Sequence, residues 1–285
     1  MKFHRPDADV FVPEPAGLTP EQALARTTHL CVVAHQDDIE IMAYAGVAEC
    51  VGRDDRHFTG VVVTDGGGSA RTGRYAGFTD AEMRAVRREE QRQAATLGRY
   101  SLQLQLAYPS ADVKRPGQPG VLEDLGRIFS GCTPEVVYLH QPADKHDTHV
   151  GLFLRCLEAL RALPRERRPR RVLGCEAWRD LDWLDDAQKV GLDVGARPEL
   201  ALELVKVFDS QISGGKRYDT ATMGRRLANA TFHTSHAVDK TTALTWAMDL
   251  TPLVHDDSLS PLDFTLSHVD RLRSDISARL RQWGA

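Results

Sequence analysis

The sequence is poor in the residue types that mark several common classes of protein. It has only five cysteines, widely spread and with no Cys-x-x-Cys pair, so neither a disulfide framework nor a thiolate zinc site is indicated. No run approaches the roughly 20 apolar residues that span a membrane. Lysine plus arginine number 36 against 40 for aspartate plus glutamate, and the net charge of −4 argues against a nucleic-acid-binding protein.

These absences favour a cytoplasmic protein with reduced, buried thiols. Residues 1–20 lack the apolar segment of a secretory signal. The chain has 285 residues, 42% of them hydrophobic and 27% charged, which is enough to build a sizeable globular core. Because thiolate pairs are missing, any metal must be held by histidine and carboxylate side chains.

Short apolar runs alternate with amphipathic segments over the first 180 residues. The runs predict five strands, at 29–34, 58–64, 101–107, 135–140 and 171–177. Between them the pattern predicts four helices, at 39–52, 79–97, 121–129 and 148–163. The strand at 101–107 alternates leucine with polar residues, as a half-exposed or edge strand would. This alternation predicts an α/β fold with an open, mostly parallel sheet and helices on both faces.

The same pattern divides the chain into three parts. We expect an N-terminal extension at 1–28, a catalytic core at 29–180 and a C-terminal elaboration packed on that core at 181–285. In the last part only 198–213 and 261–283 are predicted as helices.

Two clusters of histidine and aspartate follow predicted strands. His35, Asp37 and Asp38 come directly after the first strand, and His146 and His149 follow the fourth. Ligands of open α/β sheets bind beyond the carboxyl ends of the strands, so these clusters can converge. Helix capping would explain one acidic residue after the first strand, but not a histidine with two adjacent carboxylates.

Together the clusters supply a histidine and carboxylate set, His35, Asp38 and His149, of the kind that leaves zinc an open position for water. Such water has a pKa lowered toward about 7. Asp37 is available to take its proton, and His146 to stabilise an oxyanion or protonate a leaving group. This chemistry supports hydrolysis of an amide or an ester.

Both clusters resemble the motifs of a known family. The stretch Ala34-His35-Gln36-Asp37-Asp38-Ile39-Glu40 resembles the Ala-His-Pro-Asp-Asp-x-Glu motif of the LmbE-like (PIG-L) deacetylases. Asp144-x-His146-x-x-His149 resembles their Asp-x-His-Pro-Asp-His motif. Further similarity is carried by the Thr-Asp-Gly turn at 64–66, by Arg87-Arg88-Glu89-Glu90 and by the Ser210-Gln211 pair.

The resemblance implies a Rossmann-like fold and the zinc-dependent removal of an acetyl group from an N-acetylglucosamine-type or similar amide. It implies that His35, Asp38 and His149 bind the metal. It makes Asp37 the general base, and His146 the group that assists the oxyanion. The native metal stays open, since iron could use the same ligands.

Two departures from the motifs affect the second shell of the site. Gln36 replaces the proline of the first motif, and Asp147-Thr148 replaces Pro-Asp in the second. Asp144 is then the first choice of carboxylate to orient His146. The resemblance also suggests Asp65, Arg87 and Arg88 as substrate-binding residues, although Asp65 fits turn chemistry equally well and at least one of the arginines fits a solvated helix face.

Three hypotheses of function follow. The first is an N-deacetylase of a small N-acetylated molecule, with a homo-oligomer possible, no nucleic acid and no membrane span. The second is a metal-dependent hydrolase of a non-sugar amide or an ester. The third is a non-enzymatic metal-binding module, against which the presence of Asp37 speaks. His233 and His236 are read as loop or core histidines.

Overall fold

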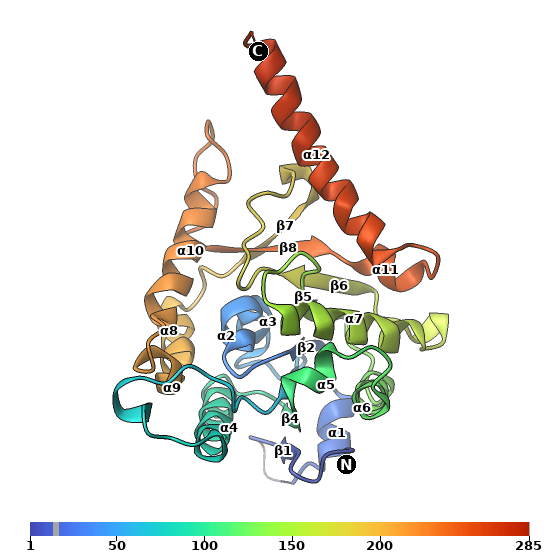
Figure 1. Cartoon of the computed structure of the whole chain (residues 1–285), viewed down its shortest axis with the longest axis vertical. Coiled ribbons are helices and arrows are strands. Elements are labelled where there is room, and N and C mark those ends of the chain that lie inside the picture. Colours follow the sequence, from blue (N-terminus) through green and yellow to red (C-terminus); the bar gives the residue numbers. More distant parts are fainter. Residues whose placement is uncertain (14–16, 285) are drawn as a thin grey trace.

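Eight strands form one sheet in the computed structural model, which describes residues 1–13 and 17–284 (Figure 1). They are β1 (Asp9–Phe11), β2 (His29–Val33), β3 (Phe58–Thr64), β4 (Leu102–Tyr108), β5 (Val136–His140), β6 (Arg171–Cys175), β7 (Lys189–Asp193) and β8 (Leu244–Asp249). Their order is β1-β4-β3-β2-β5-β6-β8-β7. The strands from β4 to β6 in this order are parallel to one another. The strand β1 pairs antiparallel with β4, β8 pairs antiparallel with β6, and β7 pairs antiparallel with β8.

Helices cover both faces of this sheet. One face carries α1 (Pro20–Ala25), α5 (Ser110–Lys114), α6 (Pro119–Ser130), α7 (Asp147–Arg161) and α11 (Thr251–His255). The other carries α2 (Asp38–Met42), α3 (Tyr44–Cys50), α4 (Asp80–Leu97) and α8 (Pro198–Lys206). The remaining helices are α9 (Asp209–Ile212), α10 (Tyr218–Phe232) and α12 (Pro261–Gln282), with single 3₁₀ turns at Gly73–Tyr75, Arg165–Arg167 and Asp186–Gln188.

Alternate residues of the central strands build a separate core on each face. In β2, Leu30 and Val32 pack into one core while Cys31 and Val33 pack into the other. All five residues of β2 are buried, because helices lie over both sides of it. The α/β fold with a mostly parallel sheet is therefore confirmed. All five cysteines are buried and unpaired.

The segment predicted as one helix at 39–52 is instead two, α2 and α3, separated at Ala43. The guanidinium of Arg226, from α10, donates hydrogen bonds to the carbonyls of Glu40 (2.7 Å) and Ile41 (3.1 Å). A continuous helix would have paired these carbonyls within itself. The break therefore depends on a residue 185 positions from Ile41, which local periodicity cannot reveal.

The strand predicted as half-exposed is fully buried in β4. Its polar positions carry Gln103 and Gln105, and the true edge strand is β1, which pairs with it. The amide of Gln105 donates to the carbonyl of Arg88 (3.0 Å), and its oxygen accepts from Gln36 (3.2 Å). Buried glutamines with hydrogen-bond partners thus imitate the alternation of an exposed strand.

The chain beyond residue 180 extends the sheet of the core. β8 pairs antiparallel with β6, and β7 pairs with β8. The predicted helix at 198–213 is divided into α8 and α9, and α10 was not predicted. Among the described residues, no helix is long and apolar enough to cross a membrane.

Candidate metal centre and active site

The two predicted clusters meet at the carboxyl ends of β2 and β5. His35 and Asp37 lie in the turn after β2, and Asp38 begins α2. His146 is the N-cap of α7, and His149 lies in the first turn of that helix. Because β2 and β5 are paired in parallel, both turns emerge at the same edge of the sheet. All five residues therefore lie close together, as expected from their positions after two strands of one parallel sheet.

Three ligand atoms of this cluster form a nearly equilateral triangle. His35 Nδ1 lies 3.2 Å from His149 Nε2 and 3.3 Å from Asp38 Oδ2, and the last two atoms are 3.3 Å apart. Three ligands roughly 2.0–2.1 Å from a tetrahedral ion lie about 3.3–3.4 Å apart. The donor set and its spacing therefore fit a zinc-like divalent cation.

The charges in this triangle are strongly coupled. Burial alone would raise the pKa of Asp38, but the neighbouring His149 and His35 hold it well below its usual range. Burial opposes protonation of His149, yet Asp38 and Asp144 raise its pKa to about 9. A cation held by the triangle would take the place of that proton.

Asp144 supports the centre from behind. Its Oδ2 lies 3.0 Å from His149 Nδ1, the arrangement that fixes the tautomer of a metal-binding histidine. The expectation was that Asp144 would orient the ring of His146, but it accepts only the backbone N–H of that residue, at 3.3 Å. The backbone N–H groups of Trp178 and Arg179 also donate to Asp144. The turn after β6 therefore helps to hold the carboxylate that orients His149.

His140 is a fourth histidine at the centre, and the sequence analysis did not assign it to the site. Its ring stacks on His149 with the centroids 3.7 Å apart, and its Nε2 lies 3.5 Å from Asp38 Oδ2. That nitrogen accepts the backbone N–H of Ala34 at 2.9 Å, so its lone pair is already used. His140 therefore packs against the ring of His149 and is not itself a further ligand. Its position as the last residue of β5, at the carboxyl end of a central strand, could have indicated that it lies at the site.

Asp37 is buried beside the triangle in an unusual backbone conformation. Its φ is 92° and its ψ is −31°, a combination that costs a non-glycine residue free energy and that concentrates at functional sites. Arg87 donates to Asp37 Oδ2 at 3.0 Å and also to the carbonyl of Gln36. Burial raises the pKa of Asp37 well above its usual range; Arg87 opposes the rise and Asp38 adds to it.

His146 lies next to the two histidines of the triangle. Its ring centroid lies 4.5 Å from that of His149 and 4.8 Å from that of His35. Burial, and after it the charge of His149, lowers the pKa of His146 to about 4. Its Nδ1 accepts the backbone N–H of Thr148 at 3.3 Å, which leaves the Nε2–H of a neutral ring as a donor.

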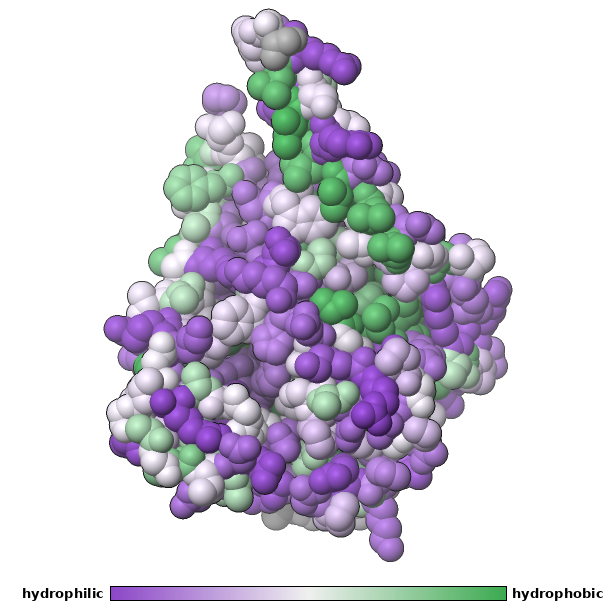
Figure 2. All heavy atoms as spheres, viewed as in Figure 1, coloured by the Kyte–Doolittle hydropathy of each residue, from purple (hydrophilic) through white to green (hydrophobic). Residues whose placement is uncertain are grey.

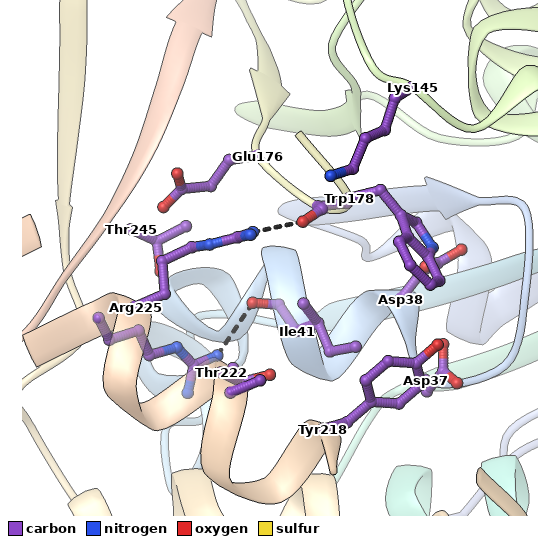
Figure 3. A pocket seen from close by; sticks show the side chains of 13 residues that line it. Asp37, Asp38, Ile41, Lys145, Glu176, Trp178, Tyr218, Thr222, Arg225 and Thr245 are labelled. Atoms are coloured by element: carbon purple, nitrogen blue, oxygen red, sulfur yellow. Dashed lines mark hydrogen bonds between the residues drawn. The ribbon is translucent and has the colours of Figure 1, made fainter. Parts of the chain in front are cut away.

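Two cavities open onto Asp37 and Asp38. One, of about 280 Å³, extends over Ile41, Ala177 and α10, and the other, of about 230 Å³, over His35, Arg87 and Gln211. Trp178 and Tyr218 line both, with their rings 6.2 Å apart and nearly perpendicular. In the view of Figure 3, Tyr218 lies next to Asp37 and Trp178 lies by Asp38 in the first cavity.

The lining residues from the C-terminal part were largely missed. Tyr218, Thr222 and Arg225 come from α10, whose pattern carried no motif. Trp178, which follows β6, lies beside the centre, with its ring centroid 6.0 Å from that of His146. Ser210 donates through its backbone N–H and hydroxyl to Glu90, each at 2.6 Å. The Ser-Gln pair and the Arg-Arg-Glu-Glu helix thus meet in space.

Two of the suggested substrate-binding residues lie outside both cavities. Asp65 pairs with Arg84 at 3.1 Å and accepts the N–H of Gly67, as its turn reading proposed. Arg88 donates to the carbonyl of Asp7 at 2.7 Å, on the far side of α4 from Arg87. Since the two arginines are adjacent in a helix, only one can face the site. His233 packs beside Trp246, and neither it nor His236 lines these two cavities.

The fold and this site define an α/β protein with a histidine and aspartate metal-type centre at the strand ends. Residues 30–160 match the family model described as GlcNAc-PI de-N-acetylase, PIG-L. Both motifs lie within this matched part, and the recognition of the PIG-L (LmbE-like) family from them is confirmed. No curated protein sequence matches the chain.

Solved structures share the fold at low sequence identity. N,N'-diacetylchitobiose deacetylase from Pyrococcus horikoshii gives a TM-score of 0.61 at 17% identity, covering 80% of this chain and 85% of its own. The A40926 pseudoaglycone deacetylase Dbv21 gives 0.57 at 17%, covering 79% and 97%. GalB, the 4-carboxy-2-hydroxymuconate hydratase from Pseudomonas putida, gives 0.60 at 19%, covering 79% and 96%. Because deacetylases and a hydratase share this fold, the reaction must be argued from the site.

Proposed function

We propose that the protein is a metal-dependent hydrolase, with zinc as the metal, that removes the acetyl group of a small N-acetylated molecule of the N-acetylglucosamine type. The observation that carries this proposal is the triangle of His35 Nδ1, Asp38 Oδ2 and His149 Nε2, with Asp37 and His146 next to it. The family of residues 30–160 supports the choice of an N-acetyl amide.

The triangle would hold the cation through two nitrogens and one oxygen. When bound, the ion would polarise the amide carbonyl and lower the pKa of water. The same ligands suit iron, so the identity of the metal is part of the test. Asp144 would keep His149 oriented with its Nε2 toward the ion.

Asp37 and His146 would handle the protons. A general base works best with a pKa near the operating pH, and burial moves the carboxyl of Asp37 upward in that direction. Arg87 keeps the ionised form accessible and fixes the position of the carboxylate. The Nε2–H of a neutral His146 would donate to the developing oxyanion. A donor held in place in this way stabilises the negative charge of the transition state.

The two cavities would receive the two sides of the scissile amide. Trp178 and Tyr218 offer aromatic faces against which a sugar ring can pack, beside the polar groups of Arg87 and Gln211. We propose a cytoplasmic location, consistent with five buried, unpaired cysteines.

The proposal is tested by measuring acetate release from N-acetylglucosamine and its glycosides with zinc-loaded and with chelator-treated protein. We expect activity that requires the metal, and an Asp37→Asn variant that binds zinc as the parent does but loses about 10²–10⁴-fold in kcat. Activity only on simple esters or non-sugar amides would establish the second hypothesis. Zinc binding without any hydrolysis would establish a metal-binding module.

A further inference from the structure

α12 projects from the body of the molecule and has almost no intramolecular partner. The helix runs over 22 residues, and within it only His268 is buried. Phe264 packs against the core near the first turn. Figure 1 shows the later turns extending away from the sheet and its helices. Helical stability in proteins comes mainly from packing an apolar face, and the outer half of α12 has no such support within the described chain.

An apolar stripe runs along the exposed side of this helix, and we call it the α12 seam. Its members are all at least 42% exposed and recur at alternating intervals of four and three residues: Leu262, Leu266, Val269, Ile276, Leu280 and Trp283. Arg273 occupies the one remaining position of the repeat. Figure 2 shows a line of hydrophobic side chains along the projecting helix.

This spacing is that of a coiled coil. Intervals of four and three repeat every seven residues, which keeps the stripe straight along a supercoil and makes it narrower than the face a helix uses against a globular core. Isolated apolar residues on a surface need no explanation, but a contiguous line of them marks an interaction site. The inward face of α12 is a different one, carrying Phe264 and His268.

Charges beside the seam identify the partner. One flank carries Asp263 and Asp270 toward the N-terminal end and Arg281 toward the C-terminal end. An antiparallel copy of the same helix presents the same flank in reverse, so Asp263 of one copy lies beside Arg281 of the other. A parallel copy would place Arg273 against itself within the apolar seam. Antiparallel packing also opposes the two helix dipoles.

We propose that two copies of this chain associate through the α12 seam as an antiparallel helix pair with two-fold symmetry. Leu266 of one copy then lies opposite Ile276 of the other, and Leu262 opposite Leu280. In this register Arg273 faces Val269 and lies beside Asp270 of the other copy. The outer turns of α12 gain the apolar partner that their own chain does not provide.

The first test is the mass of the full chain by sedimentation equilibrium over a range of concentrations. We expect a dimer for the parent and for Ala278→Glu, which adds a carboxylate on the face opposite the seam. The double variant Ile276→Glu and Leu280→Glu should sediment at half that mass and lose helical circular dichroism. A monomeric parent, or a double variant that stays dimeric, would overturn the proposal.

The second test determines the orientation of the pair. Because the five native cysteines are buried, cysteines placed on the seam can be oxidised selectively. A mixture of Leu266→Cys and Ile276→Cys proteins should form a disulfide-linked heterodimer, while neither variant alone should cross-link efficiently. Efficient cross-linking of each variant with itself would show a parallel pair and contradict the antiparallel arrangement. Zinc binding by both variants should match the parent, because α12 contributes nothing to the centre.

Discussion

The ring nitrogens of His35 and His149 lie 3.2 Å apart, although 114 residues separate them in the sequence. Two imidazole nitrogens at this distance cannot both present lone pairs to each other without a proton or a cation between or beside them. Asp38 Oδ2 completes the triangle, and its negative charge would stabilise either a proton or a metal cation at this place. A cation or a proton would therefore stabilise this cluster, and the two would compete for the same lone pairs.

This competition predicts a pH-dependent affinity for zinc. With its pKa raised to about 9, His149 is protonated in the metal-free protein at pH 7, and it must lose that proton to bind. Binding should therefore release about one proton, and affinity should rise with pH until about pH 9 and then level off. Calorimetric titration of zinc in buffers of different ionisation enthalpy measures the proton directly. Affinity independent of pH between 6 and 9 would contradict the assignment of His149.

Arg87 and Arg88 are neighbours in α4 with opposite expected roles. Removing the guanidinium in Arg87→Gln should raise the pKa of Asp37 further, since Arg87 is what opposes its rise. The base is the ionised carboxylate, so the acid limb of the kcat profile should move to higher pH. Arg88→Gln is the matched control, because its contact is with the carbonyl of Asp7. Identical pH profiles for both variants would show that Arg87 does not control the pKa of Asp37.

Asp144 and Asp147 form a second matched pair. Asp144→Asn removes the carboxylate that lies 3.0 Å from His149 Nδ1, and zinc affinity should fall about 10–100-fold. Asp147 is exposed at the start of α7, so Asp147→Asn should bind zinc like the parent. Competition against a chromogenic chelator gives both constants. A larger loss in Asp147→Asn would mean that the displaced acidic residue of the second motif supports the centre.

The candidate site was predictable where its residues lie next to strand ends. Apolar runs locate β2 and β5, parallel strands bring their carboxyl ends together, and the histidines and aspartates that follow must then converge. The capping box of α4 is equally local: Thr79 accepts the N–H of Glu82, whose carboxylate accepts the N–H of Thr79 in return. Such features depend on a few consecutive residues, so the sequence displays them directly.

Other features depend on contacts between distant segments. Asp144 turned out to orient His149 and not the ring of His146, because the fold brings the turn after β6 against it. Arg226 divides the predicted helix at 39–52 by taking two of its carbonyls. Tyr218 reaches the cavities only because α10 packs over α8 and β8.

The sequence by itself thus determined the class of fold and the five residues of the centre, since both follow from periodicity and from residue types at strand ends. The tertiary structure alone decided the second shell, the walls of the two cavities and the joining of β7 and β8 to the sheet. These depend on hydrogen bonds and packing between segments up to about 200 residues apart, where no local pattern records the partner.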